Sequence, residues 1–329
     1  MTSSIKPWLE KYRASNLEEI VGQNEYIEKF KIYVETQKMP NLIFCGPSGV
    51  GKTSSALCLA NNINKGYINQ TVLVINTSEE KKMRLVDTII KGFIDKLVSI
   101  PEDMFKIIIL DECENLSKII QSVLKDLLED SYNSKVRFIF LCNDYSKIIE
   151  SIKSKCNMFI FNTLSEEDII LRLLTIIKNE EIPFTEEGLV YLVMSAEGDM
   201  RKALNTLYFT YYCFKMINYD NVNKIVFQPK SIIVRNIFSK ILNNNPKEAN
   251  SILFKTINNG YNTLDIIYSM IKILENYNFN NDMNLSYENK SEWSKLIYET
   301  HSNIISGSNG LIQLSALIYN LHSKMDFKK

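Results

Sequence analysis

The sequence is poor in residues that commonly bind metals. It contains two histidines, His301 and His322, which are too few and too isolated to form a metal site. Its six cysteines include no C-x-x-C pair, and most of them lie inside apolar runs, as small core residues do. The sequence therefore predicts neither a zinc ribbon nor a histidine metal centre.

An excess of charge is also absent, because 38 lysine and arginine residues balance 38 aspartate and glutamate residues. Any contact with DNA must therefore come from a local basic patch. No apolar run approaches the length that crosses a bilayer, and the first residues do not form a signal peptide. We expect a soluble intracellular protein with no membrane partner, and the length of 329 residues suggests two or three domains.

What the sequence does contain is a phosphate-binding loop between an apolar run, 42–45, and a helical stretch. It matches G-x-x-x-x-G-K-[ST] at every fixed position, with the residues Gly46, Pro47, Ser48, Gly49, Val50, Gly51, Lys52 and Thr53. The glycines let backbone N–H groups turn toward a phosphate at a helix N-terminus. Lys52 would reach the β- and γ-phosphates and Thr53 would bind Mg²⁺, although a glycine-rich turn that binds nothing is the alternative.

A pair of carboxylates follows a second apolar run. Asp111 and Glu112 come directly after residues 107–110, which read as a buried parallel strand. Such strands of an open α/β sheet deliver the residues at their carboxyl ends to the ligand site. We expect Asp111 to hold the Mg²⁺ shell and Glu112 to polarise the attacking water, which indicates phosphoryl transfer to water.

Two further residues and one segment each leave two interpretations open. Asn143 ends the run 136–142 and either holds the lytic water or the γ-phosphate, or only forms a turn. Arg201 lies in the first turn of a helix, where its charge opposes the helix dipole, so it serves an external anion or is an ordinary surface residue. Trp8 and Tyr12 belong to a segment that covers an adenine base or, as the residue chemistry alone favours, packs against the core.

The order of apolar patterns predicts a parallel sheet covered by helices, followed by helices alone. Between residues 24 and 163 amphipathic stretches alternate with candidate strands at 42–45, 72–76, 106–110, 136–142 and 158–161. Ser165 caps a helix at the point where strand signals stop. Residues 228–230 read as a linker before a helical C-terminal region.

Short motifs are spread along nearly the whole chain. They are 7–13 (PWLEKYR), 21–23 (VGQ), 39–41 (MPN), the phosphate loop, 76–79 (NTSE), 111–112 (DE), 142–143 (CN), 154–156 (SKC) and 197–203 (EGDMRKA). Together they resemble the AAA+ clamp loaders, specifically the small subunits of replication factor C. Several are specific to that family rather than to P-loop proteins in general, and the missing zinc ribbon favours its eukaryotic or archaeal type.

The resemblance implies an AAA+ core over residues 1–163, a three-helix lid over 164–228 and an all-α collar domain over 229–329. It also implies an ATPase that uses ATP and Mg²⁺ as one subunit of a hetero-pentameric ring. Such a ring opens a sliding clamp and loads it on primer-template DNA, which it holds by backbone phosphates. The expected location is the nucleus or the replication compartment of a large DNA virus.

The resemblance also assigns roles that spacing could not. Four residues look like the adenine-side segment of the family: Lys11, Tyr12, Arg13 and Val21. Asn143 resembles sensor 1, and Arg201 resembles sensor 2, a lid arginine that touches the γ-phosphate. Lys155 stands where the family donates an arginine to the ATP of the neighbouring subunit.

In three places this chain departs from the family pattern. Its Ser-Arg-Cys motif reads Ser-Lys-Cys around Lys155, and a lysine lacks the planar fork that holds phosphate oxygens at two points. The helix after the carboxylates usually carries an arginine pair in the family, but here it reads Leu124, Lys125 and Asp126. Ala14 stands in place of a proline. We therefore expect a complete site in cis and a weakened contribution in trans.

Local positive charges are the candidates for DNA contact: Lys81, Lys82, Arg84 and Lys125. Contact with phosphates alone predicts an affinity that falls steeply with salt and ignores base sequence, although each residue could instead belong to a solvated helix face. The apolar residues Ile90, Phe93 and Ile94 match the segment that meets the clamp in relatives, with burial in the subunit's own core as the alternative.

Two rival functions remain open at this point. One is a ring subunit that binds ATP as a structural element without hydrolysing it. The other is a different AAA+ DNA motor, such as a branch-migration ATPase, which lacks a collar domain.

Overall fold

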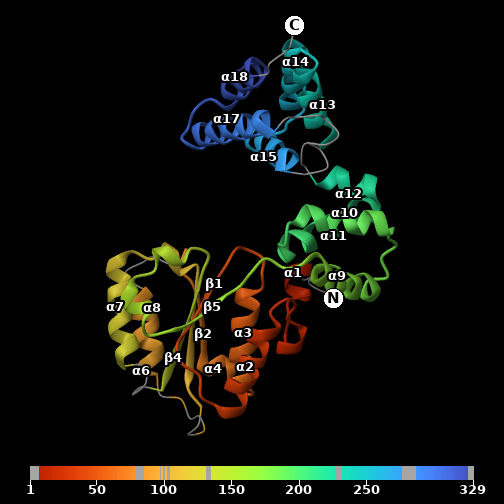
Figure 1. Ribbon diagram of the computed structural model, residues 1–329. Helices are drawn as coiled ribbons and strands as arrows, with labels where there is room; N and C mark the ends of the chain where they lie inside the picture. Colours follow the sequence, from red (N-terminus) through yellow and green to blue (C-terminus); the bar gives the residue numbers. More distant parts are fainter. Residues whose placement is uncertain are drawn as a thin grey trace. The chain divides into compact units, whose positions relative to one another are not determined.

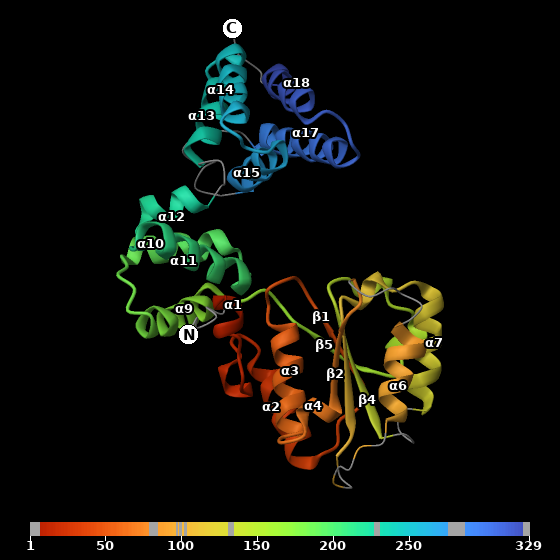
Figure 2. The ribbon, with the colours of Figure 1, turned by 180° about the vertical axis from the view of Figure 1, so that it is seen from behind.

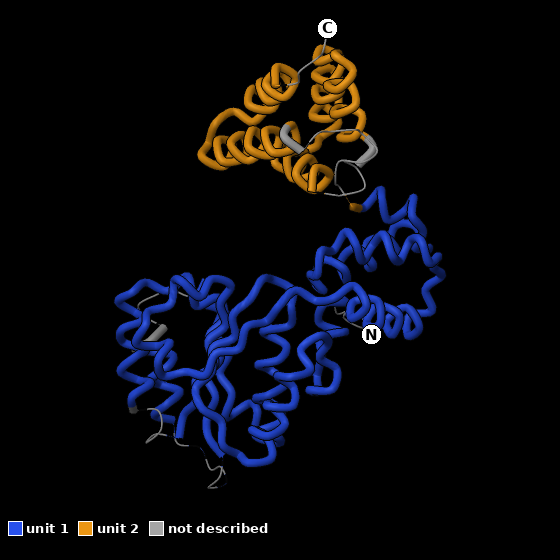
Figure 3. The backbone as a smooth tube through the Cα atoms, viewed as in Figure 1, with its two compact units in different colours: residues 1–225 blue, residues 226–329 orange. Residues whose placement is uncertain are grey.

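The computed structural model describes residues 7–78, 85–96, 98, 101, 104–130, 135–226, 231–275 and 287–324. The chain forms two compact units, residues 1–225 and 226–329, shown in different colours in Figure 3. The first unit contains the expected core segment, 1–163, and residues 164–225 of the expected lid segment, 164–228.

A five-stranded parallel sheet forms the centre of the first unit, in the order β2-β3-β4-β1-β5. Its strands are β1 (Leu42–Cys45), β2 (Val72–Asn76), β3 (Lys106–Asp111), β4 (Val136–Cys142) and β5 (Asn157–Ile160). The predicted fold class is confirmed, and four strands begin where the sequence placed them. The fifth begins and ends one residue early.

Both faces of the sheet are buried, because apolar side chains alternate between two cores. Leu42, Phe44 and Ile107 pack on one face, and Ile43 and Ile108 on the other. A strand buried on both faces must be apolar throughout, which explains the uninterrupted apolar runs. Figure 1 shows α2 (Asn24–Thr36) and α3 (Lys52–Ile63) on the first face, with the short α4 (Ile68–Thr71) preceding β2.

Helices α6 (Lys91–Asp95) and α7 (Lys118–Asp130) cover the second face, as Figure 2 shows from behind, and α8 (Glu150–Lys153) lies beside α7 on the same face (Figure 1). A π-helical turn, Leu85–Ile90, leads into α6, and short 3-10 turns span Leu17–Glu19, Cys113–Asn115 and Tyr145–Lys147. The turn Cys113–Asn115 follows β3 and the turn Tyr145–Lys147 follows β4, so both lie at the carboxyl edge of the sheet.

Four helices continue the first unit after the sheet: α9 (Glu166–Asn179), α10 (Glu186–Ala196), α11 (Met200–Phe214) and α12 (Tyr219–Ile225). The first three of them begin with side-chain caps. Ser165 caps α9, Thr185 caps α10 and Asp199 caps α11, and each accepts a hydrogen bond from a backbone N–H of the first turn. The N-terminal helix α1 (Trp8–Lys11) packs on α11, where Trp8 meets the rings of Tyr208 and Tyr211. Trp8 is therefore a packing residue.

The second unit contains the helices α13 (Ser231–Leu242), α14 (Pro246–Asn258), α15 (Thr263–Glu275), α17 (Tyr287–Ile305) and α18 (Gly310–Ser323). Its core includes Trp293, whose ring lies 5.3 Å from that of Phe238. Pro246 is the first residue of α14, as predicted. Within this unit the apolar face of α18 is buried through Leu314, Leu317, Ile318 and Leu321.

All six cysteines have free thiols. Cys58, Cys113 and Cys142 are buried, Cys45 and Cys156 are half-buried, and Cys213 on α11 is exposed. Among the described residues, no helix combines the length and the apolar content that a membrane span requires.

Candidate nucleotide-binding site

A cavity of about 520 Å³ lies in the first unit, at the carboxyl edge of the sheet. The predicted site residues that line it are Tyr12, Arg13, Val21, Ser48, Gly49, Val50, Gly51, Lys52, Thr53, Asp111, Glu112, Asn143 and Arg201. The phosphate loop, the two carboxylates and Asn143 meet because β3, β4 and β1 are neighbours, so the segments that follow these strands share one edge of the sheet. Tyr12, Arg13 and Val21 come from the N-terminal segment, and Arg201 comes from α11.

Backbone conformations that favour glycine shape the phosphate loop. Gly49 has φ +69°, and Gly51, which precedes α3, has φ +96°. A Cβ atom at Gly49 would come within 1.7 Å of a carboxylate oxygen of Asp199. That carboxylate accepts a hydrogen bond from Ser48 at 2.9 Å, and the Met200 N–H donates to the Gly49 carbonyl at 3.0 Å. The loop is thereby tied to the start of α11.

Lys52 is buried and held by three oxygens. Its ammonium donates to the carbonyls of Gly46 and Pro47 at 2.7 and 2.6 Å, and to Asn143 Oδ1 at 2.9 Å. Burial lowers the pKa of Lys52, and the negative charge of Asp111 opposes this effect. Gly46 and Pro47 are not among the lining residues of the cavity, so they hold Lys52 rather than face the ligand space.

The oxygen ligands expected for Mg²⁺ lie together. The Thr53 hydroxyl donates to Asp111 Oδ2 at 2.9 Å, across the end of β4. Glu112 follows with φ +56°, a left-handed conformation that turns the chain sharply after β3. Its carboxylate accepts a hydrogen bond from the Ser78 hydroxyl, and its carbonyl accepts one from Thr77 at 2.8 Å.

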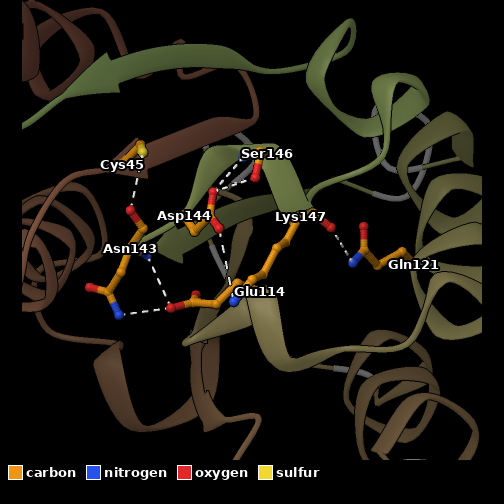
Figure 4. A network of polar contacts seen from close by, with 7 residues as sticks. All are labelled: Cys45, Glu114, Gln121, Asn143, Asp144, Ser146 and Lys147. Atoms are coloured by element: carbon orange, nitrogen blue, oxygen red, sulfur yellow. Dashed lines mark hydrogen bonds and ion pairs between the residues drawn. The ribbon is translucent and has the colours of Figure 1, made fainter. Parts of the chain in front are cut away.

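Asn143 lies between Lys52 and a third carboxylate, Glu114. Oε1 of Glu114 accepts hydrogen bonds from Asn143 N at 3.1 Å and from Asn143 Nδ2 at 2.7 Å (Figure 4). The next residue, Asp144, accepts from Ser146 and caps its own turn. The carboxylate of Asp144 therefore binds within its own turn, whereas the carboxylate of Glu114 binds Asn143.

Of the expected adenine-side residues, Lys11 is not among those that line the cavity. Its ammonium pairs with Glu180, the C-cap residue of α9, which also accepts a hydrogen bond from the Tyr12 hydroxyl. These two contacts lower the pKa of Glu180. The lining residue Arg172, which is on α9 too, donates to the Tyr12 carbonyl at 3.0 Å and fixes this segment from the same helix.

Two other predicted cations meet outside the cavity. Lys155 pairs with Glu129 at the end of α7, and Lys125 lies 3.4 Å from the same carboxylate. Hydrogen bonds from Lys155 and then Lys125 lower the pKa of Glu129. The remaining candidates for DNA contact, Lys81, Lys82 and Arg84, lie outside the described residues.

The segment expected to meet a clamp is largely built into the core. Ile90 is fully buried against the second face of the sheet, and Phe93 and Ile94 are partly buried against the same cluster. Burial in the subunit's own core accounts for Ile90, whereas Phe93 and Ile94 keep some exposed surface.

Three residues of this site were not predicted from the sequence: Glu114, Arg172 and Asp199. Glu114 could have been noticed as a further acid two residues after Glu112. The sequence identifies Asp199 as a helix cap, but it gives no sign of the contact between Asp199 and Ser48, which lies 151 positions away along the chain. Arg172 follows no strand and carries no local signal.

Solved structures of similar fold include the RuvB Holliday junction branch migration motor of Thermotoga maritima. The match has a TM-score of 0.52 at 17% identity and covers 70% of this chain and 79% of that chain. At this identity the likeness concerns the fold alone.

Relatives at higher identity cover nearly the whole chain. The probable replication factor C subunit 2 of Dictyostelium discoideum is 36% identical, covering 96% of this chain and 92% of the relative. A replication factor C small subunit of Methanococcus vannielii is 35% identical, with 95% and 97% covered. The putative replication factor C small subunit R395 of Acanthamoeba polyphaga mimivirus is 34% identical, with 98% of each covered.

Two family models match separate parts of the chain. Residues 42–164 match the ATPase family associated with various cellular activities (AAA), and residues 229–320 match the replication factor C C-terminal domain. With a P-loop site at the sheet edge and relatives of this identity along nearly its full length, the chain belongs to the replication factor C small-subunit family, the AAA ATPases of sliding-clamp loaders.

Proposed function

We propose that this subunit binds ATP with Mg²⁺ in the cavity and hydrolyses it in cis. The observation that carries the proposal is the convergence of Lys52, Asp111 and Glu112 on one cavity. Its volume of about 520 Å³ falls in the range of small-molecule sites.

The residues present fit a hard cation. Thr53 Oγ1 and Asp111 Oδ2, 2.9 Å apart, are oxygen donors of the kind that Mg²⁺ prefers. When bound with the nucleotide, the ion would neutralise charge that develops on the phosphate oxygens. Lys52 would exchange its three oxygen partners, including Asn143 Oδ1, for phosphate oxygens, and its burial strengthens that attraction. Glu112 would accept the proton of the attacking water, and Arg201 would add charge from α11.

At the other end of the cavity, Tyr12, Arg13 and Val21 are proposed to contact the adenosine part of ATP. The contacts of Glu180 and Arg172 hold this segment against α9, so a base bound there would sense the position of the lid helices. Lys11 contributes through Glu180 rather than from the wall of the cavity.

The partners and their residues follow from the family. We propose a hetero-pentameric ring in which residues 164–228 act as lid and 229–329 as collar, and which acts on a sliding clamp and primer-template DNA in a nucleus or a viral replication compartment. Lys155 would act on the neighbour's ATP after exchanging Glu129 for phosphate. Lys125 would contact DNA phosphates, together with Lys81, Lys82 and Arg84.

Of the rival functions, a branch-migration motor is disfavoured by the match of residues 229–320 to the replication factor C C-terminal domain. A subunit that binds ATP without hydrolysing it is disfavoured by Glu112, which stands beside the cation ligands at the cavity.

The test is the ATPase activity of the reconstituted ring with clamp and primed DNA. Lys52→Ala or Glu112→Gln should each reduce the turnover at this subunit's site at least about a hundredfold, and removal of Mg²⁺ should do the same. The exposed Lys65→Ala and Glu28→Gln serve as matched controls. Unchanged turnover in Glu112→Gln would support the non-hydrolysing subunit.

A further inference from the structure

Glu114 occupies a position from which it can determine the function of Asn143. It lies in the 3-10 turn Cys113–Asn115, directly after the sharp turn at Glu112. The turn brings its carboxylate under the end of the neighbouring strand β4. There one oxygen, Oε1, accepts both the backbone N–H and the side-chain amide of Asn143 (Figure 4).

The two neighbours of Asn143 decide which way its amide group points. The Lys52 ammonium can only donate hydrogen bonds, and an ionised carboxylate can only accept them. Asn143 therefore satisfies both neighbours in one orientation, with Oδ1 toward Lys52 at 2.9 Å and Nδ2 toward Glu114 at 2.7 Å. With the amide turned over, Oδ1 would face the carboxylate and Nδ2 would face the ammonium, which places like groups together on both sides.

The stability of the fold alone does not explain why a carboxylate stands at position 114. Its other oxygen, Oε2, is buried and has no hydrogen-bond partner among the residues that the structure describes. A buried acceptor without a partner reduces the stability of the fold. A carboxylate kept in such a position is therefore a candidate for a role in the site beside it.

We propose that Glu114 is a positioning residue that fixes Asn143 with its amide oxygen on the phosphate side of the cavity. This inference rests on the proposed ATP hydrolysis. When Lys52 leaves Asn143 for phosphate oxygens, Oδ1 loses its donor while Nδ2 stays on Glu114. The cavity is then offered a hydrogen-bond acceptor, which suits the O–H of an attacking water, whereas a γ-phosphate oxygen would require a donor.

The orientation can be tested without turnover, by NMR of the side-chain amide of Asn143 in the full-length chain labelled with ¹⁵N-asparagine. The signal is assigned with Asn143→Asp. Glu114→Met keeps the length of the side chain without its acceptor, and Glu114→Gln keeps one acceptor oxygen. Glu150→Gln, at an exposed carboxylate on α8, is the control.

In the wild type we expect a shifted Asn143 amide signal with slow hydrogen exchange. Glu114→Met should move it to the position of an exposed asparagine and speed exchange at least about tenfold, because the charged partner is lost. Glu114→Gln and Glu150→Gln should leave it near the wild-type position. A wild-type signal typical of free asparagine, or one unchanged in Glu114→Met, would overturn the proposal.

Kinetics of the reconstituted ring then test the consequence. Glu114→Met should lower kcat about ten- to a hundredfold with KM for ATP changed less than about threefold, and Glu114→Gln should restore most of the rate. Wild-type turnover in a Glu114→Met ring whose Asn143 signal has moved would refute the positioning role. If Glu112→Gln leaves turnover unchanged, the proposed hydrolysis fails instead, while the NMR result still decides the orientation.

Discussion

The charged residues of the cavity and those around Glu129 differ in burial and in how tightly their partners hold them. In the cavity Lys52 is buried, and the contacts of Thr53, Asp111 and Asn143 place each polar group within 3 Å of a partner. Around Glu129 the lysines are partly exposed, with side-chain accessibilities of 37% for Lys125 and 32% for Lys155. Exposed ion pairs contribute little to stability, so Lys125 and Lys155 can change partners at small cost.

We infer from this difference that the fold sets the geometry of the cavity, whereas the lysines around Glu129 are available to a partner molecule. The cavity residues follow three adjacent strands, and the sheet register fixes their spacing. Lys125 lies within α7 and Lys155 follows the short helix α8. Their shared partner is the exposed carboxylate of Glu129, and Asp126 also lies 3.8 Å from Lys125. We therefore expect substitutions in the cavity to act on this chain alone and substitutions around Glu129 to act through the assembly.

The largest effect expected on the exposed side comes from Lys155→Arg. In the reconstituted ring it should raise ATP turnover at the neighbouring site about tenfold, because a guanidinium binds two phosphate oxygens where an ammonium binds as a point charge. Lys153→Arg, whose native lysine pairs with Glu150, is the matched control. Equal turnover in both rings would show that Lys155 does not limit the rate.

A smaller effect is expected from Gly49→Ala on the buried side. Its methyl group would overlap Asp199 and require φ +69°, so the tie between the phosphate loop and α11 should break. We expect nucleotide affinity to fall about tenfold and the first thermal unfolding transition of the isolated chain to lose about 1–3 kcal/mol.

Gly92→Ala provides the control, since Gly92 is helical and a Cβ there meets no atom within 4 Å. Fluorescence titration with a labelled ATP and differential scanning calorimetry measure the two quantities. Equal behaviour of the two variants would mean that Asp199 moves aside freely and that the loop does not depend on α11.

The smallest effect belongs to Glu129→Gln in the isolated chain. Its lysine partners hold the pKa of Glu129 below the usual 4.5, so the pairing stabilises the fold above that pH and is lost as the pH falls through the lowered value. The wild type should melt about 1–3 °C above the variant at pH 7, and the gap should close below pH 4.5. A gap that widens in acid would contradict this assignment.

Most of the cavity could be predicted because its signals are local. An apolar run of four or more residues predicts a buried strand, and a polar residue directly after it is placed at the ligand edge, as with Asp111 and Asn143. Lys52 was placed there by the phosphate-loop motif. The strand order itself is not local. It emerged only in the structure, together with the fact that β4 separates the phosphate loop from the carboxylates.

The unpredicted parts depend on long-range or exposed pairing. Asp199 meets Ser48, and Glu180 meets Tyr12, across more than 150 residues of sequence, and no periodic pattern encodes such contacts. Lys155 was assigned a role in trans from a family motif, whereas its partner within the chain, Glu129, carries no sequence signal. Asn143 could be placed at the end of its strand from the sequence, whereas Glu114 and its contact with the Asn143 amide became known only from the side-chain positions.

The distribution of thiols has a practical consequence for following helix α11 in solution. Burial raises the pKa of Cys45 and Cys58 to about 11 and that of Cys156 to about 12, so these thiols are almost entirely protonated at neutral pH. Cys113 and Cys142 are buried out of reach of reagents, which leaves Cys213 on α11 as the accessible nucleophile. A maleimide dye would therefore label the unmodified chain mainly on the helix that carries Arg201, and could report its motion as nucleotide enters.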